Sequence, residues 1–283
     1  MIRVLITGAG SYIGTHIAAH LSQYPDRFVV SELDVQEGLQ QQAFSGVDTV
    51  IHVAGIAHRK ETEGSEPLYQ AVNATLAVDT ARMAKLAGAK QFIFFSSMSV
   101  YGMTTGRITA DTPLTPSTYY GQSKLAAEKG MAALADECFA VATLRPPMIY
   151  GRGCKGNYPR LSALARKLPV FPKVRNERSM LYIGTLCAFV EKLIESGEGG
   201  LFFPQNREYV NTADMVQKIA ACHGRKLRCI PGCGWLMKLL ESRVGVVGKV
   251  FGTLTYDHAM STAFSDENEQ PFADTIRDTE VGE

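Results

Sequence analysis

The sequence predicts an α/β protein with a doubly wound parallel sheet, and three observations support this fold class. Short apolar segments of β-favouring residues alternate with amphipathic helical segments through residues 1–150. This alternation is typical of parallel sheets whose strands are connected by helices. The first strand runs directly into a glycine-rich turn and a helix. Beyond residue 151 the alternation becomes irregular, which indicates that a smaller, irregular α/β lobe follows the sheet domain.

We therefore divide the 283 residues into three parts. Residues 1–150 form the sheet domain, and residues 151–265 form mainly the second lobe. A segment near 180–203, with a helix followed by a short strand, is expected to return to the first domain. Residues 266–283 are polar and acidic and are expected to form a C-terminal tail.

The turn after the first strand has the layout of a phosphate-binding loop. It reads Thr7-Gly8-x-x-Ser11-x-x-Gly14, with a further glycine at Gly10. Glycines let the backbone turn sharply and approach a pyrophosphate, and a helix N-terminus offers unpaired N–H groups and a partial positive charge. A plain strand–helix turn is the alternative, but the flanking strand and helix favour a Rossmann-type dinucleotide site. The predicted contacts are Gly8, Gly10, Ser11, Tyr12, Ile13 and Gly14.

Two acids lie at the end of the second predicted strand, residues 28–35. Glu32 and Asp34 can each accept hydrogen bonds from the adenosine ribose hydroxyls and repel a 2′-phosphate. Such an acid favours NAD over NADP. A solvated strand end is the alternative, because the offset from Gly14 matches the usual spacing of about 20 residues only approximately.

Three side chains form the predicted catalytic group. Tyr120 and Lys124 are four residues apart on a predicted helix and therefore share one face. An ammonium beside the tyrosine stabilises its phenolate and lowers its pKa. Ser97 follows a buried strand, at the end of the sheet where doubly wound folds bind ligands. The alternative is that all three residues are structural.

Together these features resemble the extended short-chain dehydrogenase/reductase family over the chain to about residue 200. The family's loop is Thr-Gly-x-x-Gly-x-x-Gly, and Ser11 stands here at the position of its middle glycine. A further strand and helix of the family are shortened or missing between residues 36 and 46. The other matching segments are Val53-Ala54-Gly55, Ser96-Ser97-x-x-Val100-Tyr101-Gly102 and Tyr120-x-x-x-Lys124.

The resemblance implies a cofactor, NAD with NADP as the alternative, and a mechanism. Tyr120 would move a proton at a sugar hydroxyl or carbonyl while the nicotinamide exchanges a hydride at the same carbon. Lys124 would also hydrogen-bond the nicotinamide ribose, and Asp34 with Val35 would hold the adenine. The remaining cofactor contacts that the family pattern implies are Val53, Ala54, Gly55, Asn73 and Pro147.

The substrate residues follow from the same resemblance. Asn157 and Arg178 lie in segments that resemble the nucleotide-sugar sites of 4-epimerases and 4-ketoreductases. Arg178 would bind the diphosphate through its guanidinium fork, and Asn157 would bind the diphosphate or uracil. Ser97 and Met148 would lie near the sugar, Met148 where the family has a polar residue. A solvated basic loop is the alternative for the two lobe residues.

The resemblance leaves three functions open. The first is a UDP-sugar 4-epimerase-like enzyme acting at C4 of a UDP-hexose or UDP-hexosamine. The second is a 4-keto-nucleotide-sugar reductase that consumes NAD(P)H, and the third is a non-catalytic dinucleotide sensor. Dehydration is not expected, because Met98 and Ser99 occupy the positions where nucleotide-sugar dehydratases carry Asp-Glu.

Composition constrains the partners. The net charge of +1 gives no reason to expect nucleic acid or an anionic membrane as a partner. Membrane insertion is not expected, and a homodimer is compatible with the sequence. The six cysteines are scattered, which predicts free thiols, a cytoplasmic location and no metal site.

Overall fold

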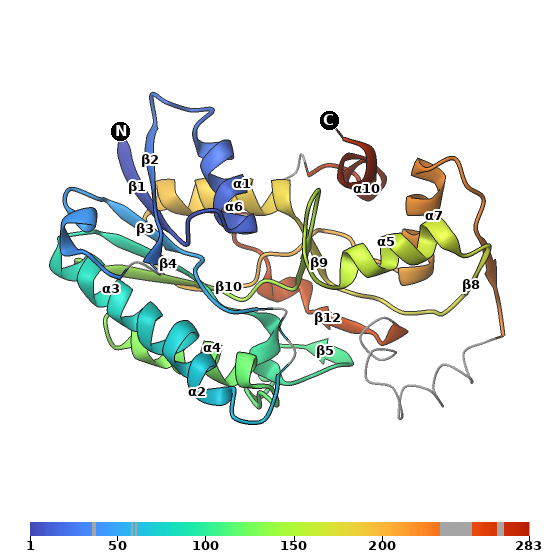
Figure 1. The fold of residues 1–283 in the computed structure, drawn as a ribbon, viewed down its shortest axis with the longest axis horizontal. Helices are drawn as coiled ribbons and strands as arrows, with labels where there is room; N and C mark the ends of the chain where they lie inside the picture. The colour runs from blue at the N-terminus through green and yellow to red at the C-terminus, as the bar shows by residue number, and fades with distance from the viewer. Residues whose placement is uncertain (36–37, 58, 60, 233–250, 265–268, 283) are drawn as a thin grey trace.

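The computed structural model describes residues 1–35, 38–57, 59, 61–232, 251–264 and 269–282. Within these residues, a six-stranded parallel sheet forms the centre of the first domain, in the order β10-β6-β4-β3-β1-β2 (Figure 1). The predicted fold class is confirmed. The strands are β1 (Ile2–Thr7), β2 (Phe28–Leu33), β3 (Thr49–His52), β4 (Gln91–Phe95), β6 (Ala140–Leu144) and β10 (Gly200–Phe202).

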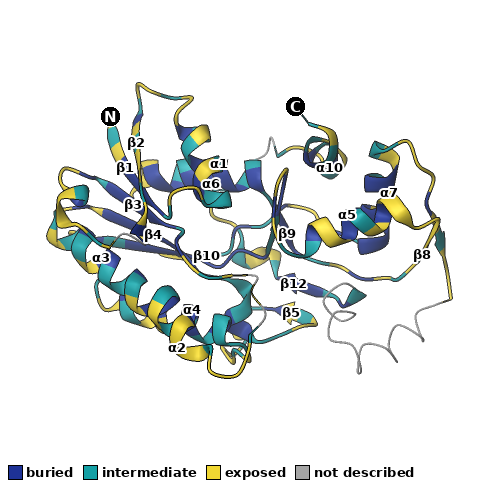
Figure 2. Ribbon diagram, in the orientation of Figure 1, coloured by how far each residue is buried: buried dark blue, intermediate teal, exposed yellow. Residues whose placement is uncertain are grey.

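Helices cover both faces of this sheet, which explains why its central strands are buried along their length rather than on alternate residues. Every residue of β3 and β4 is buried. One face packs against α1 (Tyr12–Leu21) and α6 (Ile183–Ser196), and the other packs against α3 (Leu76–Leu86) and α4 (Tyr119–Ala132). Figure 2 shows the resulting buried layer along the strands.

β2 is the edge strand of the sheet, because the connection from β2 to β3 contains no further strand among its described residues. The described part of the connection includes the 3-10 helix η2 (Gln41–Phe44), whose Phe44 is buried in the core. The resemblance to the extended family indicated this shortening. Gln36 and Glu37 lie outside the described residues.

The second lobe has its own core of aromatic and aliphatic side chains between α5 (Asn157–Lys167) and α7 (Thr212–Cys222). Residues 233–250 and 265–268 lie outside the described residues. Within 180–203, α6 and β10 belong to the layers of the first domain, with β10 paired to β6. The lobe and its junction comprise β5 (Gly106–Ile108), β7 (Met148–Tyr150), α5 (Asn157–Lys167), β8 (Val170–Pro172), β9 (Met180–Tyr182), α7 (Thr212–Cys222), β11 (Arg228–Ile230), β12 (Leu254–Tyr256) and α10 (Phe272–Val281).

The C-terminal segment contains the helix α10, which packs on the second lobe. Ile276 is buried in the lobe core. The Glu280 carboxylate accepts hydrogen bonds from the Tyr158 and Ser162 hydroxyls, both at 2.9 Å, and lies 2.8 Å from His223 Nε2. The polar residues that suggested a tail therefore bind the lobe, through partners more than fifty residues away in sequence.

Candidate active site

The glycine turn is held close to the end of β3 by contacts that leave no room for side chains. Gly8 has φ +102°, and a Cβ there would lie 2.8 Å from the Ala54 nitrogen. A Cβ on Gly14 would lie 3.1 Å from Val53 Cγ2. Gly10 has φ +70°, and a Cβ there would have no other atom within 4 Å. The loop therefore has the shape of a cradle that a pyrophosphate can approach, and a dinucleotide fits these residues.

Ser11 explains how the loop works without the family's middle glycine. Its side chain caps α1 by accepting a hydrogen bond from the Gly14 nitrogen at 3.2 Å. Ile13 packs against the first-domain core. The Tyr12 hydroxyl is buried and would lie 2.6 Å from a Cβ on Gly151, so its side chain points toward the second lobe. The side chains of Tyr12 and Ile13 thus point away from the loop, and their cofactor contacts at the start of α1 stay predictions.

The acids at the end of β2 lie beside this loop. The exposed Glu32 carboxylate accepts a hydrogen bond from the Gly10 nitrogen at 3.3 Å. Asp34 is also exposed, and Val35 is buried. A negative charge next to the glycine turn fits an adenosine ribose and opposes a 2′-phosphate. The adenine contact of Val35 stays a prediction.

We expect the double change Glu32→Ala and Asp34→Ala to weaken NAD binding and to reduce the preference for NAD over NADP. The physical reason is the loss of both ribose acceptors and of the charge that repels the 2′-phosphate. Titration of the protein with NAD and with NADP, followed by calorimetry, measures both affinities. An unchanged ratio would show that neither acid contacts the ribose.

The first turn of α4 is held by two oxygen acceptors. The Thr118 hydroxyl accepts from the Gly121 nitrogen at 3.1 Å. The Glu61 carboxylate accepts from the Tyr119 and Tyr120 nitrogens at 3.1 and 3.0 Å. A carboxylate is favourable at a helix N-terminus, where the macrodipole is positive. Glu61 thus fixes the backbone that carries Tyr120, and sequence reasoning missed it.

Tyr120 and Ser97 meet at the end of β4. Burial raises the pKa of Tyr120, and hydrogen bonding to Ser97 opposes the rise. The expectation that Lys124 lowers the pKa of Tyr120 is wrong here, because the Lys124 ammonium donates to the Phe95 carbonyl instead. Ser97 also accepts from the Ser99 nitrogen at 3.1 Å, which fixes its position at the start of the 3-10 helix η4 (Met98–Tyr101). The predicted pair therefore shares one location.

Lys124 is buried one turn further along α4. Its Nζ donates to the Phe95 carbonyl at 2.7 Å and lies 4.7 Å from the centre of the Phe94 ring. Burial lowers the pKa of Lys124 to about 8, and the nearby Glu128 carboxylate opposes that shift. A Cβ on the exposed Gly55 would lie 3.5 Å from Nζ. The small residue at Gly55 therefore leaves Lys124 close to the surface where a nicotinamide ribose is expected.

Asn73 ties the loop after β3 to α4. It lies in a π-turn (Gln70–Thr75), a feature often found at functional sites. Its Oδ1 accepts from the Ile56 nitrogen at 2.7 Å, and its Nδ2 donates to the Ile56 carbonyl at 3.0 Å and to the Ser123 hydroxyl at 3.2 Å. These contacts give Asn73 a supporting position, and its cofactor contact stays a prediction.

Sequence reasoning also missed the buried ion pair beneath the site. Arg145 Nη2 lies 2.6 Å from Glu128 Oε2, and both side chains are less than one-tenth exposed. The Ser96 hydroxyl donates to Glu128, and Arg145 Nη1 donates to the Tyr101 hydroxyl at 2.9 Å. The only sequence signal was Glu128 at one helical turn beyond Lys124.

The predicted substrate residues lie at the junction and in the second lobe. Met148 begins β7, Asn157 begins α5, and Pro147 is buried beside Met148. Arg178 Nη1 donates to the Gly252 carbonyl at 2.9 Å, and burial lowers the pKa of Arg178. Among the described residues, no carboxylate forms an ion pair with Arg178. No hydrogen bond in the described chain joins these residues to the catalytic group, so their substrate role stays a prediction.

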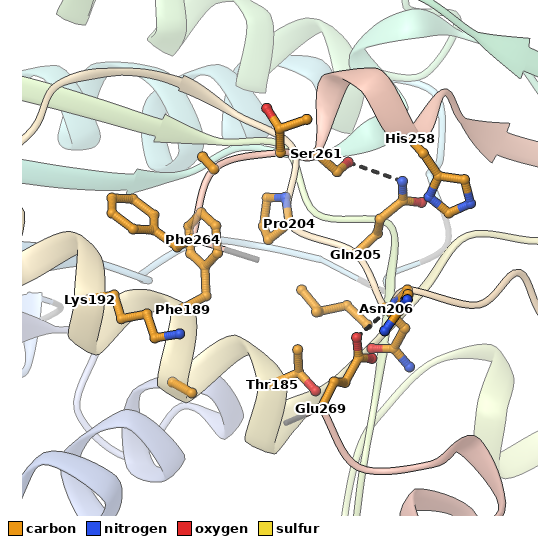
Figure 3. A pocket seen from close by; sticks show the side chains of 15 residues that line it. Thr185, Phe189, Lys192, Pro204, Gln205, Asn206, His258, Ser261, Phe264 and Glu269 are labelled. Carbon is orange, nitrogen blue, oxygen red and sulfur yellow. Dashed lines mark hydrogen bonds between the residues drawn. The ribbon is translucent and has the colours of Figure 1, made fainter. Parts of the chain in front are cut away.

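A cavity of about 580 Å³ lies on the α6 side of the sheet (Figure 3). Thr185, Phe189 and Lys192 of α6 face Phe264 and Ser261 across it. Gln205 Nε2 donates to the Ser261 hydroxyl at 3.0 Å along its wall. Since Ser97, Tyr120 and Lys124 do not line it, this cavity is separate from the candidate active site.

The described residues contain no group of three or more His, Cys, Asp or Glu side chains arranged to hold a metal ion. The sequence places Cys229 and Cys233 four residues apart, and Cys233 lies outside the described residues. Within the same residues, every helix is too short or too polar to cross a lipid bilayer.

The chain belongs to the NAD dependent epimerase/dehydratase family, whose family profile matches residues 4–219. It is 29% identical to UDP-glucose 4-epimerase of Vibrio cholerae, over 90% of this chain and 87% of that protein. It is 26% identical to N-acetyl-alpha-D-glucosaminyl-diphospho-ditrans,octacis-undecaprenol 4-epimerase of Escherichia coli O157:H7, over 70% of this chain and 64% of that protein.

Solved structures show the same fold. UDP-glucuronic acid 4-epimerase from Bacillus cereus, in complex with NAD, superposes with a TM-score of 0.76 at 17% identity, covering 99% of this chain and 98% of that one. A dTDP-4-dehydrorhamnose reductase from Clostridium acetobutylicum gives 0.76 at 19% identity, covering 98% of both chains. The match extends beyond the family profile into the second lobe.

Proposed function

We propose that this protein is an NAD-dependent 4-epimerase that acts at C4 of a UDP-linked hexose or hexosamine. One observation carries the proposal: Ser97 and Tyr120 meet at the end of β4, with Lys124 one helical turn away and the glycine cradle at the end of β1, two strands along the sheet. The relatives named above support the sugar nucleotide and the position of the reaction.

The residues of the chain would divide the work as follows. Gly8, Gly10 and the start of α1 hold the pyrophosphate, and Lys124 holds the nicotinamide ribose. Bound NAD supplies a hydride acceptor and donor. The Tyr120 oxygen takes a proton from the C4 hydroxyl and returns it, while Ser97 orients that hydroxyl by a hydrogen bond. Burial lowers the pKa of Lys124 to about 8, so this lysine titrates near neutral pH.

A 4-keto-nucleotide-sugar reductase is the second candidate, and the edge position of β2 favours it. Because the described residues of the β2–β3 connection contain no further strand beyond the edge strand β2, the adenosine end of the cofactor would have little cover. A cofactor that exchanges in each turnover suits a reductase, whereas an epimerase retains NAD. The same catalytic side chains serve both reactions.

Cofactor stoichiometry separates the two candidates. The protein is incubated with UDP-glucose and with UDP-N-acetylglucosamine at a catalytic amount of NAD, and the anomeric NMR signals are followed. Interconversion of the C4 epimers without net change in NADH supports the epimerase. Stoichiometric loss of NADH absorbance with a 4-keto sugar nucleotide supports the reductase. Absence of both reactions, with dinucleotide binding intact, contradicts the proposal.

Arg178→Ala should weaken UDP binding by about one to two decades, because a charge-assisted contact to a diphosphate contributes roughly 1.5–3 kcal/mol. NAD affinity should stay at the wild-type value, since Arg178 lies outside the glycine cradle. Calorimetric titration with UDP measures the effect.

Arg175→Ala is the matched control for this change. Arg175 is an exposed arginine three residues earlier, so its loss changes the net charge equally. Equal UDP affinity in wild type and Arg178→Ala would make Arg178 a structural residue. A similar loss in both variants would indicate general attraction by positive charge.

We also infer a cytoplasmic location. The five described cysteines are all free thiols, and two of them, Cys154 and Cys187, are buried. Free thiols persist in reducing compartments, which are also where sugar nucleotides would meet this enzyme.

A further inference from the structure

We propose that the outer end of the second lobe is a docking surface for an anionic phospholipid membrane. Figure 1 places α5, α7 and β8 at the end of the molecule remote from the central sheet. We call the surface formed by the end of α5, the β8–β11 ribbon and the loop before β11 the distal patch. Its residues are Leu164, Arg166, Lys167, Leu168, Val170, Lys173, Arg225, Lys226, Arg228 and Ile230.

Backbone and side-chain contacts make this patch continuous. Val170 pairs with Arg228, and Pro172 pairs with Ile230, in the parallel ribbon. The Arg225 guanidinium donates to the carbonyls of Arg166 and Lys167, which closes the gap between the loop after α7 and the end of α5.

The distal patch exposes four aliphatic side chains close together, and such groups of exposed apolar side chains mark interaction sites. Leu164, Leu168, Val170 and Ile230 are 42, 36, 43 and 45% exposed. Successive side chains of a strand point to opposite faces. Phe171 is buried in the lobe core, so its neighbour Val170 faces outward together with its register partner Arg228.

Positive charge is concentrated in the part of the sequence that contributes α5 and β8 to the distal patch. Residues 152–178 contain eight Lys or Arg and one acid, whereas residues 1–150 contain eleven Lys or Arg and thirteen acids. The net charge of +1 therefore conceals one strongly basic segment, residues 152–178, in a chain whose remaining residues carry more acids than Lys and Arg. Among the described residues, the six cations of the distal patch form no ion pair with a carboxylate. They are available to an anionic partner.

Exposed cations beside exposed aliphatic groups fit an anionic lipid surface. Aliphatic side chains enter the boundary between headgroups and acyl chains, and Lys and Arg bind anionic headgroups. Binding of single-stranded nucleic acid without sequence preference uses stacked aromatic rings, and the distal patch contains no aromatic residue. A DNA duplex would use the cations alone and gives the exposed aliphatic side chains no partner. The chain would lie on the membrane without crossing it, which places its active site near a bilayer.

Vesicle co-sedimentation with the full chain tests the proposal. Vesicles of phosphatidylcholine alone are compared with vesicles containing one-third phosphatidylglycerol, at low and high salt. We expect binding only to the anionic vesicles, reduced at high salt because salt screens exposed charges. Lys167→Glu with Arg228→Glu should lower the partition coefficient by about tenfold or more. Val170→Ser with Ile230→Ser should lower the fraction that remains bound at high salt.

The control exchanges the same number of charges on the first domain. Lys90→Glu with Lys129→Glu alters two exposed lysines far from the distal patch. Equal losses in the two charge variants, equal binding to neutral and anionic vesicles, or no binding of wild type to anionic vesicles at low salt would each overturn the proposal. The proposal would also be overturned if Lys167→Glu with Arg228→Glu lost binding of a DNA oligonucleotide and kept vesicle binding.

Discussion

Tyr120→Phe lowers kcat by about 10²- to 10⁴-fold and leaves NAD affinity close to wild type. The substitution removes the hydroxyl that transfers the proton and keeps the ring, so packing hardly changes. The partner that remains, Ser97, is already engaged with the Ser99 nitrogen and cannot replace it as a base. Epimerisation or reduction rates at saturating substrate, together with calorimetric NAD titration, measure the two effects.

Tyr119→Phe is the matched control. Tyr119 precedes Tyr120 on the same first turn of α4, and its nitrogen bonds the same Glu61 carboxylate. Its loss of a hydroxyl should leave kcat within about tenfold of wild type. A Tyr120→Phe variant with most of the wild-type kcat would show that another group moves the proton. Parallel loss of NAD binding would point to damage to the fold.

Arg145→Met destabilises the protein by about 3–5 kcal/mol. The change leaves the Glu128 carboxylate buried without its cation, which costs far more than an exposed ion pair contributes. The Glu128 and Arg145 side chains are 9 and 7% exposed, so water cannot take the place of the guanidinium. Urea unfolding followed by circular dichroism gives the free energy of unfolding.

Two further variants separate this cost from the loss of a side chain. The double change Glu128→Leu and Arg145→Met removes both charges and should recover part of the lost stability. Arg82→Met breaks the exposed Arg82–Asp79 pair, also 2.6 Å long, and should change the free energy of unfolding by less than about 1 kcal/mol. Equal losses for Arg145→Met and Arg82→Met would refute the role assigned to burial.

The sequence was sufficient for the features that depend on local pattern. Alternating strands and helices predicted the parallel sheet, and the glycine spacing predicted the sharp turn between β1 and α1. The four-residue spacing of Tyr120 and Lys124 placed both on α4. Each of these signals lies within a few residues of chain, where backbone geometry and helical periodicity decide the outcome.

Other parts of the site depend on partners that are distant in the chain. Glu61 reaches the α4 backbone across 59 residues, and Arg145 meets Glu128 only after β6 has joined the sheet. A single acid or arginine in a sequence carries no sign of the group it will meet. The substrate residues in the second lobe share this difficulty, because irregular loops place them and no periodic pattern fixes those loops.

Helix α10 has a consequence for how the chain is made. Translation delivers it well after α5 and α7, although its Ile276 and Glu280 complete a core that begins more than a hundred residues earlier, at Tyr158. Until α10 has left the ribosome, the surfaces of α5 and α7 that it covers face the solvent, and the nascent chain has an exposed apolar area. The sheet domain is different, because its last strand, β10, ends at Phe202. The sheet domain therefore has all its strands before the core of the second lobe is complete.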